Sequence, residues 1–272
     1  MPRLALPDTE LHYLDTGTAA SGETLLMSHG LLMNVDLFAP QVAALRSRFR
    51  CIAYDHRGQG QSAESSLRSI DMGTLAGDAA HVVEKLCPEG VHFVGLSMGG
   101  FVGLRLAARR PELVKSLVLI ATSAEAEDPR NVPKYLAMNL VARTLGARLL
   151  TRSVLEILFG KSFLRDPRSR DELERWKRHF QDLPRSIHRA VTGVIERDSV
   201  LPELARIHCP TLVLVGDEDV ATPRARAERI VAHVEGAELR VVPRAGHSAT
   251  VEEPEAVTRE ISAFLERQRP SA

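Results

Sequence analysis

The chain has 272 residues, which is enough for one large α/β domain or two small ones. Lys plus Arg and Asp plus Glu number 35 each, so the formal net charge is zero and the composition does not favour nucleic-acid binding. The three widely spaced cysteines argue against a disulfide framework or a zinc site, and we expect Cys51 and Cys209 to be buried, inert thiols. The N-terminus lacks the apolar stretch of a signal peptide, and no apolar run approaches the ~20 residues of a membrane span, so a cytoplasmic protein is expected.

Short apolar runs that stop at glycine, aspartate or histidine predict a series of strands. The first of them alternates apolar and polar residues, which is typical of an edge strand, and the others read as buried strands. Helical spacing of apolar residues separates the strands. The predicted strands span residues 11–15, 24–28, 50–54, 91–95, 116–121, 211–215 and 238–242, and the predicted helices span 36–49, 71–86, 98–110, 223–234 and 254–267.

This alternation stops in the middle of the chain. From about residue 123 to about residue 204 the sequence shows only helical patterns with charged faces. Strands alternating with helices on both sides of an all-helical insert predict a mostly parallel sheet, covered on both faces, with a helical cap. We therefore predict a core domain formed by 1–122 and 205–272 and a cap formed by 123–204, some of whose apolar side chains line a pocket.

Ser97 lies in the motif Gly95-Leu96-Ser97-Met98-Gly99, between a predicted strand and a predicted helix. A serine on such a sharp turn sits in strained backbone, and glycines two residues before and two after it leave room for the turn. This context favours a nucleophile whose hydroxyl is raised above the sheet edge. The alternative is a glycine-rich turn with an incidental serine.

A serine hydroxyl needs a base, and the base needs an orienting carboxylate. Such groups gather at the carboxyl ends of parallel strands, and His247 is the one histidine downstream of Ser97 that follows a predicted strand. We therefore predict that His247 is the base. The acid comes from the loop after residue 215, where the residues alone do not rank Asp217, Glu218 and Asp219.

A developing oxyanion also requires hydrogen-bond donors. The residue after the nucleophile supplies one backbone N–H at a helix N-terminus, and this is Met98. The loop Ser28-His29-Gly30-Leu31 follows another predicted strand, and Leu31 is its best candidate for the second donor. The alternative is that this loop is a simple turn.

Five ordered motifs now resemble those of the α/β-hydrolase superfamily over nearly the whole chain. Within it, the chain is most similar to small bacterial esterases, cofactor-free haloperoxidase-like arylesterases and 3-oxoadipate enol-lactonases. The resemblance implies an α/β-hydrolase fold with a mostly parallel eight-stranded sheet, helices on both faces and a helical cap. The motifs are Ser28-His29-Gly30, Asp55-His56-Arg57-Gly58-Gln59-Gly60-Gln61-Ser62, Gly95-Leu96-Ser97-Met98-Gly99-Gly100, Gly216-Asp217-Glu218-Asp219 and Gly246-His247.

The resemblance also implies roles for individual residues. The family's serine and histidine fall on Ser97 and His247, and its oxyanion amide falls on Leu31. The family's acid lies three residues after the glycine, which selects Asp219 and leaves Asp217 as the runner-up. Haloperoxidase-like members often carry an aromatic residue where this chain has Leu31, which is a departure from their pattern.

We therefore expect a serine hydrolase that cleaves carboxylic esters through an acyl-enzyme intermediate, with no metal and no organic cofactor. A lactonase or a carbon–carbon bond hydrolase would use the same triad, and a thioesterase or another acyl transferase is a further option. A small-molecule receptor on the same scaffold is the alternative from another class of protein. The expected partner is a small ester or lactone, not nucleic acid or membrane, and a homodimer is compatible with the sequence.

Overall fold

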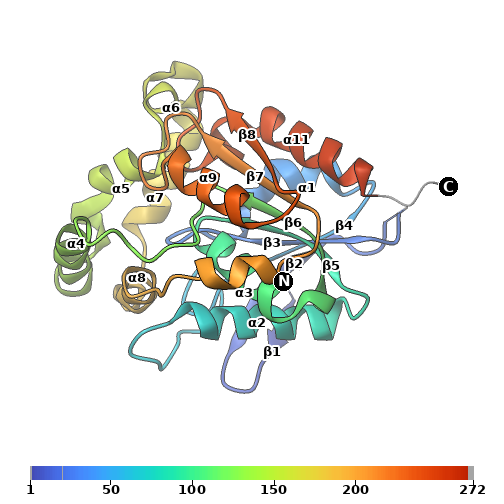
Figure 1. The fold of residues 1–272 in the computed structure, drawn as a ribbon. Coiled ribbons are helices and arrows are strands. Elements are labelled where there is room, and N and C mark those ends of the chain that lie inside the picture. Colours follow the sequence, from blue (N-terminus) through green and yellow to red (C-terminus); the bar gives the residue numbers. More distant parts are fainter. Residues whose placement is uncertain (1, 20, 269–272) are drawn as a thin grey trace.

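The computed structural model describes residues 2–19 and 21–268, and an eight-stranded sheet lies at its centre (Figure 1). The strand order is β1-β2-β4-β3-β5-β6-β7-β8. The β1–β2 and β2–β4 pairs are antiparallel, and the six strands β3 to β8 run parallel to one another. This confirms the predicted sheet. The strands are β1 (Arg3–Ala5), β2 (Glu10–Asp15), β3 (Thr24–Ser28), β4 (Arg50–Tyr54), β5 (Val91–Leu96), β6 (Val114–Ile120), β7 (Thr211–Gly216) and β8 (Glu238–Val242).

Strand β2 is not the edge strand that its alternating pattern predicts. β1 pairs along its outer side, with Leu4 opposite Leu11. Because β1 has only three residues, it is too short to show a period of two, and the sequence gives no sign of it.

The central strands are apolar throughout because both of their faces are buried. Successive side chains of a strand point to opposite faces. In β3, Leu25 and Met27 belong to one apolar core and Leu26 belongs to the other. In β5, Phe93 and Val94 are divided in the same way. The sheet therefore separates two cores, each closed by its own helices.

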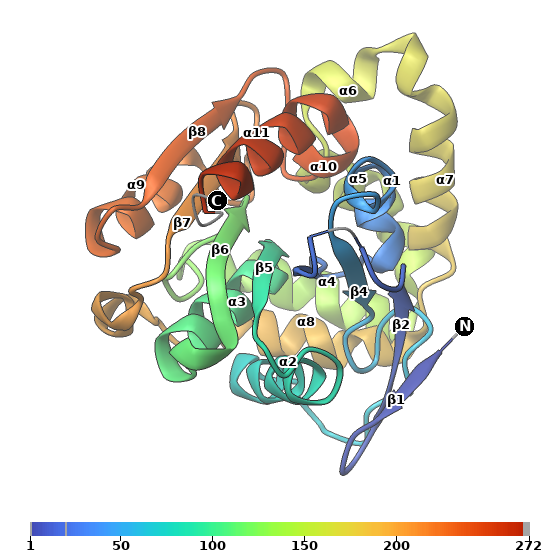
Figure 2. The ribbon, with the colours of Figure 1, turned by 90° about the vertical axis from the view of Figure 1, so that its right-hand side faces the viewer.

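Helices α2 and α3 cover one face of the sheet, and α1 and α11 cover the other (Figures 1 and 2). The predicted helix over 36–49 is divided: a 3₁₀ turn spans Val35–Phe38, and α1 ends at Leu45. Pro40 accounts for the break, since proline is favoured in the first turn of a helix. The helices are α1 (Ala39–Leu45), α2 (Met72–Leu86), α3 (Met98–Arg109), α9 (Arg224–His233), α10 (Ala249–Glu252) and α11 (Pro254–Arg267).

Only helices and turns lie between β6 and β7, and in Figure 1 they gather beyond one end of the sheet. Trp176 and Phe180 of this segment are buried in the core that also contains α1 and α11. Four of its leucines, by contrast, are exposed: Leu136, Leu140, Leu145 and Leu149. The segment contains α4 (Val132–Thr144), α5 (Thr151–Leu158), α6 (Lys161–Arg165), α7 (Arg170–Gln181) and α8 (His188–Ile195).

The cysteines follow the predicted pattern only in part. Cys51 is buried, and burial raises its pKa to about 12. Cys209 is half-buried, not buried as predicted, although desolvation still raises its pKa to about 11. Across residues 2–19 and 21–268, no helix has the length and apolar character needed to cross a bilayer.

Candidate active site

Ser97 stands at a tight bend between β5 and α3. Its backbone has φ 54° and ψ −112°, a region that costs a non-glycine residue free energy and is found mostly at functional sites. A Cβ on Gly95 would lie 2.4 Å from the carbonyl oxygen of Gly99, and a Cβ on Gly99 would lie 1.9 Å from that of Ser28. The predicted need for two glycines is confirmed. Its cause is crowding, because only Ser97 of these three has a positive φ.

The structure brings Ser97, His247 and Asp219 together in one chain of hydrogen bonds. The Oγ of Ser97 lies 2.8 Å from Nε2 of His247. Nδ1 of His247 lies 3.0 Å from Oδ2 and 3.1 Å from Oδ1 of Asp219. With the Nδ1–H donating to the carboxylate, the Nε2 lone pair accepts the hydroxyl proton of Ser97.

Asp219 is held in place by the loop that follows β7. The amides of Ala221 and Thr222 both donate to Oδ1 at 2.9 Å, and the Thr222 hydroxyl donates to Oδ2 at 2.8 Å. The other two carboxylates of the loop point elsewhere. Asp217 is exposed and accepts the amide of Arg244, and Glu218 accepts the amide and hydroxyl of Ser162. Of the three candidates, only Asp219 contacts His247.

His247 is buried, which by itself favours the neutral imidazole. The charge of Asp219, its hydrogen bond to the ring and the charge of Glu252 outweigh this desolvation, and they raise the pKa of His247 above its ordinary value. The surroundings therefore stabilise an imidazolium at this position.

Leu31 and Met98, the two predicted oxyanion donors, are both near Ser97: Met98 follows it in the chain, and Leu31 lines the same cavity. Met98 is the first residue of α3, where the amide has no partner within the helix. Leu31 follows β3 and lines the same cavity as Ser97 and His247. A Cβ on the neighbouring Gly30 would lie only 3.4 Å from that of Ser97, so the loop passes directly against Ser97.

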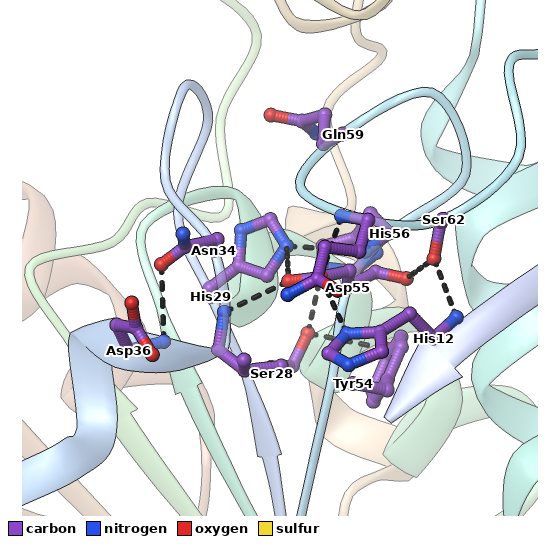
Figure 3. A network of polar contacts seen from close by, with 12 residues as sticks. His12, Ser28, His29, Asn34, Asp36, Tyr54, Asp55, His56, Gln59 and Ser62 are labelled. Atoms are coloured by element: carbon purple, nitrogen blue, oxygen red, sulfur yellow. Dashed lines mark hydrogen bonds and ion pairs between the residues drawn. The ribbon is translucent and has the colours of Figure 1, made fainter. Parts of the chain in front are cut away.

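A buried polar network holds the loop that follows β3 in place (Figure 3). Asp55 accepts hydrogen bonds of 2.8 Å from the amides of Val35 and Gln61, and its carboxylate also contacts Nδ1 of His12 at 2.8 Å and Nε2 of His29 at 3.8 Å. His29 accepts the amide of His56 on Nε2 at 3.1 Å and donates from Nδ1 to the carbonyl of Gly30 at 2.7 Å. His29 and His56 therefore have structural roles, and burial lowers the pKa of each.

Two further side chains hold the same loop. The Leu32 amide donates to Oε1 of Gln59 at 2.9 Å, and Nε2 of Gln59 lies 3.7 Å from Sδ of Met98. His179 of α7 contacts the Leu32 carbonyl through Nε2 at 2.8 Å. Gln59 lies inside a motif noted in the sequence, but its spacing does not indicate this contact. Nothing in the helical pattern around His179 points to Leu32.

Glu252 makes hydrogen bonds that the sequence pattern does not reveal. This buried carboxylate accepts the amides of Gly246 and Ser248, the two neighbours of His247, each at 2.9 Å. It also accepts the amide of Gly160, between α5 and α6, at 2.7 Å. A Cβ on Gly246 would lie 2.2 Å from the Gly160 nitrogen, so the two backbones can meet only as glycines.

We expect Glu252→Ala to lower the free energy of unfolding by about 2 kcal/mol or more, because it leaves buried amides without an acceptor. Burial raises the pKa of Glu252 to about 7, above its unfolded value of 4.5. The carboxyl therefore contributes most to stability at low pH, and that contribution falls as the pH rises to 7. Urea unfolding at about pH 5.5 and about pH 8.5 measures both effects. Glu253→Ala, at the half-buried neighbouring carboxylate, is the control, and equal losses in the two variants would contradict the prediction.

A largely apolar cavity opens above Ser97 and His247. One wall is the loop that carries Leu31, and the other walls come mostly from α4, α5, α7 and α8. Among the apolar side chains that line it are Met138, Val154, Leu158, Phe180 and Val191. The helical segment therefore covers Ser97 and forms most of the surface that a ligand would contact. No group of three or more potential metal-binding side chains occurs in the part of the chain that the structure describes.

Several known proteins resemble the chain over nearly its whole length. RutD of Caulobacter sp. (strain K31), a proposed carbamate hydrolase, is 28% identical over 256 residues, which cover 93% of this chain and 94% of that protein. The enol-lactonase from Burkholderia xenovorans LB400 superposes with a TM-score of 0.88 at 28% identity, covering 97% of this chain and 100% of the other. A thermophilic esterase from Thermogutta terrifontis superposes with a TM-score of 0.90 at 27% identity, covering 99% of this chain and 100% of the other.

The family model described as the alpha/beta hydrolase fold matches residues 23–254. That range includes β3 to β8, the bend at Ser97 and both loops that carry Asp219 and His247. The chain therefore belongs to the α/β hydrolase fold family and is a hydrolase of that family.

Proposed function

We propose that the protein hydrolyses carboxylic esters by nucleophilic catalysis at Ser97. The observation that carries the proposal is the continuous hydrogen-bond chain from Ser97 Oγ through the His247 ring to Asp219. A hydroxyl, a base and an orienting carboxylate in this order are what acyl transfer requires. The apolar cavity directly above the hydroxyl supports a small organic substrate.

In the first half of the reaction, His247 Nε2 takes the Ser97 proton while Oγ attacks the ester carbonyl. The amides of Leu31 and Met98 donate to the tetrahedral oxyanion, and Asp219 stays ionised and stabilises the imidazolium. His247 then returns the proton to the leaving alcohol, which gives acyl-Ser97. In the second half, the same base activates a water molecule that releases the acid and restores the hydroxyl.

A lactone would follow the same steps, since it is an ester whose leaving alcohol stays tethered to the acyl group. The likeness to the Burkholderia xenovorans enol-lactonase favours this second candidate. Comparing linear p-nitrophenyl esters with a panel of lactones separates the two. A lactonase would show its higher kcat/KM on the cyclic substrates.

The direct test is labelling with a fluorophosphonate, followed by mapping of the modified residue. The proposal expects one label, on Ser97, together with turnover of short p-nitrophenyl esters that the label abolishes. A label on another serine, or full turnover after Ser97 has been modified, would overturn it.

The pH dependence of kcat/KM reports the base in the free enzyme. Because the pKa of His247 is raised above 6.5, we expect activity to fall as the pH drops through a value above 6.5, where the ring becomes protonated and cannot accept the Ser97 proton. A pH profile with a p-nitrophenyl ester, read at the isosbestic wavelength of the phenol, measures it. An acid limb well below that value would contradict the assignment.

A further inference from the structure

The cavity above Ser97 contains one place where its walls are charged. Of all the described residues that line the cavity, only Glu127 and Arg197 are acidic or basic, apart from the imidazole of His247. Glu127 follows β6 and Arg197 follows α8, so the fold brings them together from segments 70 residues apart.

Two nitrogens of the Arg197 guanidinium, Nε and Nη1, donate hydrogen bonds to other groups of the protein. Its Nη1 donates to Oε2 of Glu127 at 2.9 Å and to the carbonyl of Val194 at 2.8 Å, and its Nε donates to the carbonyl of Glu125 at 3.0 Å. The Arg197 side chain is 5% exposed and that of Glu127 is 14% exposed. Among the described residues that line the cavity, the one Lys or Arg side chain is therefore already paired with a carboxylate.

The pair and Ser97 line the same cavity. The guanidinium carbon of Arg197 is 4.5 Å from the centre of the Phe101 ring, and Phe101 itself lines the cavity. The Phe101 amide donates to the Ser97 carbonyl at 3.0 Å, which places Phe101 one helical turn from the reacting hydroxyl. The ion pair, the Phe101 ring beside it and Ser97 therefore line one cavity, and a substrate held at Ser97 shares that cavity with the pair.

A carboxylate that enters this cavity loses its hydration, and the free-energy cost of this desolvation is large unless a cation or hydrogen-bond donors replace the water. The one guanidinium present is neutralised by Glu127, and the Glu127 carboxylate repels a second anion beside it. We infer that the site selects neutral, apolar esters and that Glu127 is the residue that excludes substrates carrying a carboxylate. The inference rests on the proposed function, because it concerns the substrate class of the same site.

Three esters of matched length test this selectivity. p-Nitrophenyl hexanoate is neutral, mono-p-nitrophenyl adipate carries a carboxylate at the end of the acyl chain, and 4-(hexanoyloxy)benzoate carries one on the leaving group. We expect the wild type to prefer the neutral ester by ~10²-fold or more in kcat/KM, once corrected for the intrinsic reactivity of each ester in buffer. Similar corrected values for the neutral ester and either anionic ester would overturn the inference without any variant.

Glu127→Gln removes the compensating charge and leaves Arg197 cationic. For this variant we expect the ratio of kcat/KM on at least one anionic ester to kcat/KM on the neutral ester to rise by ~10-fold or more over the wild type. A folded Glu127→Gln variant that gains nothing on either anionic ester would show that Glu127 does not exclude them.

Glu125→Gln is the matched control. Its carboxylate pairs with Arg226 and Arg229, so the substitution removes the same charge two residues away and keeps the pair of Arg197 with Glu127. We expect its selectivity to equal that of the wild type. An equal rise in kcat/KM on the anionic esters in both variants would show that only the net charge of the protein matters, and this would overturn the inference. A wild type that hydrolyses none of the esters and takes no fluorophosphonate label would instead refute the proposed function.

Discussion

Ser97→Ala should lower kcat/KM for p-nitrophenyl esters by ~10³-fold or more, while the protein stays folded. The substitution removes the one oxygen that lies 2.8 Å from His247 Nε2, and no acyl-enzyme can form without it. The residual rate reports what the Leu31 and Met98 amides and the cavity contribute alone. His247→Ala should cause a loss of similar size, because the hydroxyl then has no base.

The two variants together test whether Ser97 and His247 act as one unit. If they do, the double variant is hardly slower than either single one, since each change already removes the shared step. Steady-state kinetics over a range of ester concentrations, with thermal unfolding to confirm the fold, give the comparison. Ser153→Ala, at an exposed serine of α5, is the matched control and should keep wild-type activity. If the fold-loss in kcat/KM of the double variant equalled the product of the two single fold-losses, the result would be inconsistent with the mechanism.

The second large effect is expected at the acid. Asp219→Asn should reduce kcat by ~10³-fold or more, because an amide NH₂ facing Nδ1 favours the tautomer whose Nε2 carries the proton and cannot accept another. The amides of Ala221 and Thr222 still bond the side-chain oxygen, so the loop keeps its shape and the loss is chemical.

Asp217→Asn is the comparison that makes this prediction specific. Its side chain is exposed, and among the described residues its hydrogen-bond partner is the Arg244 amide, from which an asparagine oxygen accepts equally well. We expect kcat within ~3-fold of the wild type, in line with a surface change. The opposite ranking of Asp217 and Asp219 would show that the wrong carboxylate has been assigned to His247.

The sequence by itself determined the strand and helix order in the parallel part of the sheet. Every strand from β3 to β8 begins and ends within two residues of its predicted position, because a strand buried on both faces must be apolar throughout and stops where polar turn residues begin. It also placed Ser97, because a bend that needs two glycines around a serine is a local requirement. The predicted helix over 36–49 was less accurate, since Pro40 restarts the helix within one pattern.

Only the tertiary structure decided which distant groups meet. The residues alone did not rank Asp217, Glu218 and Asp219, and the family resemblance selected Asp219; the direction in which the loop turns each carboxylate is seen only in the fold. The same holds for Glu252, which joins segments 92 residues apart, and for Arg197 with Glu127. A buried charge or amide is satisfied by whichever partner the packed fold brings within 3 Å, and such a partner leaves no periodic trace in the sequence.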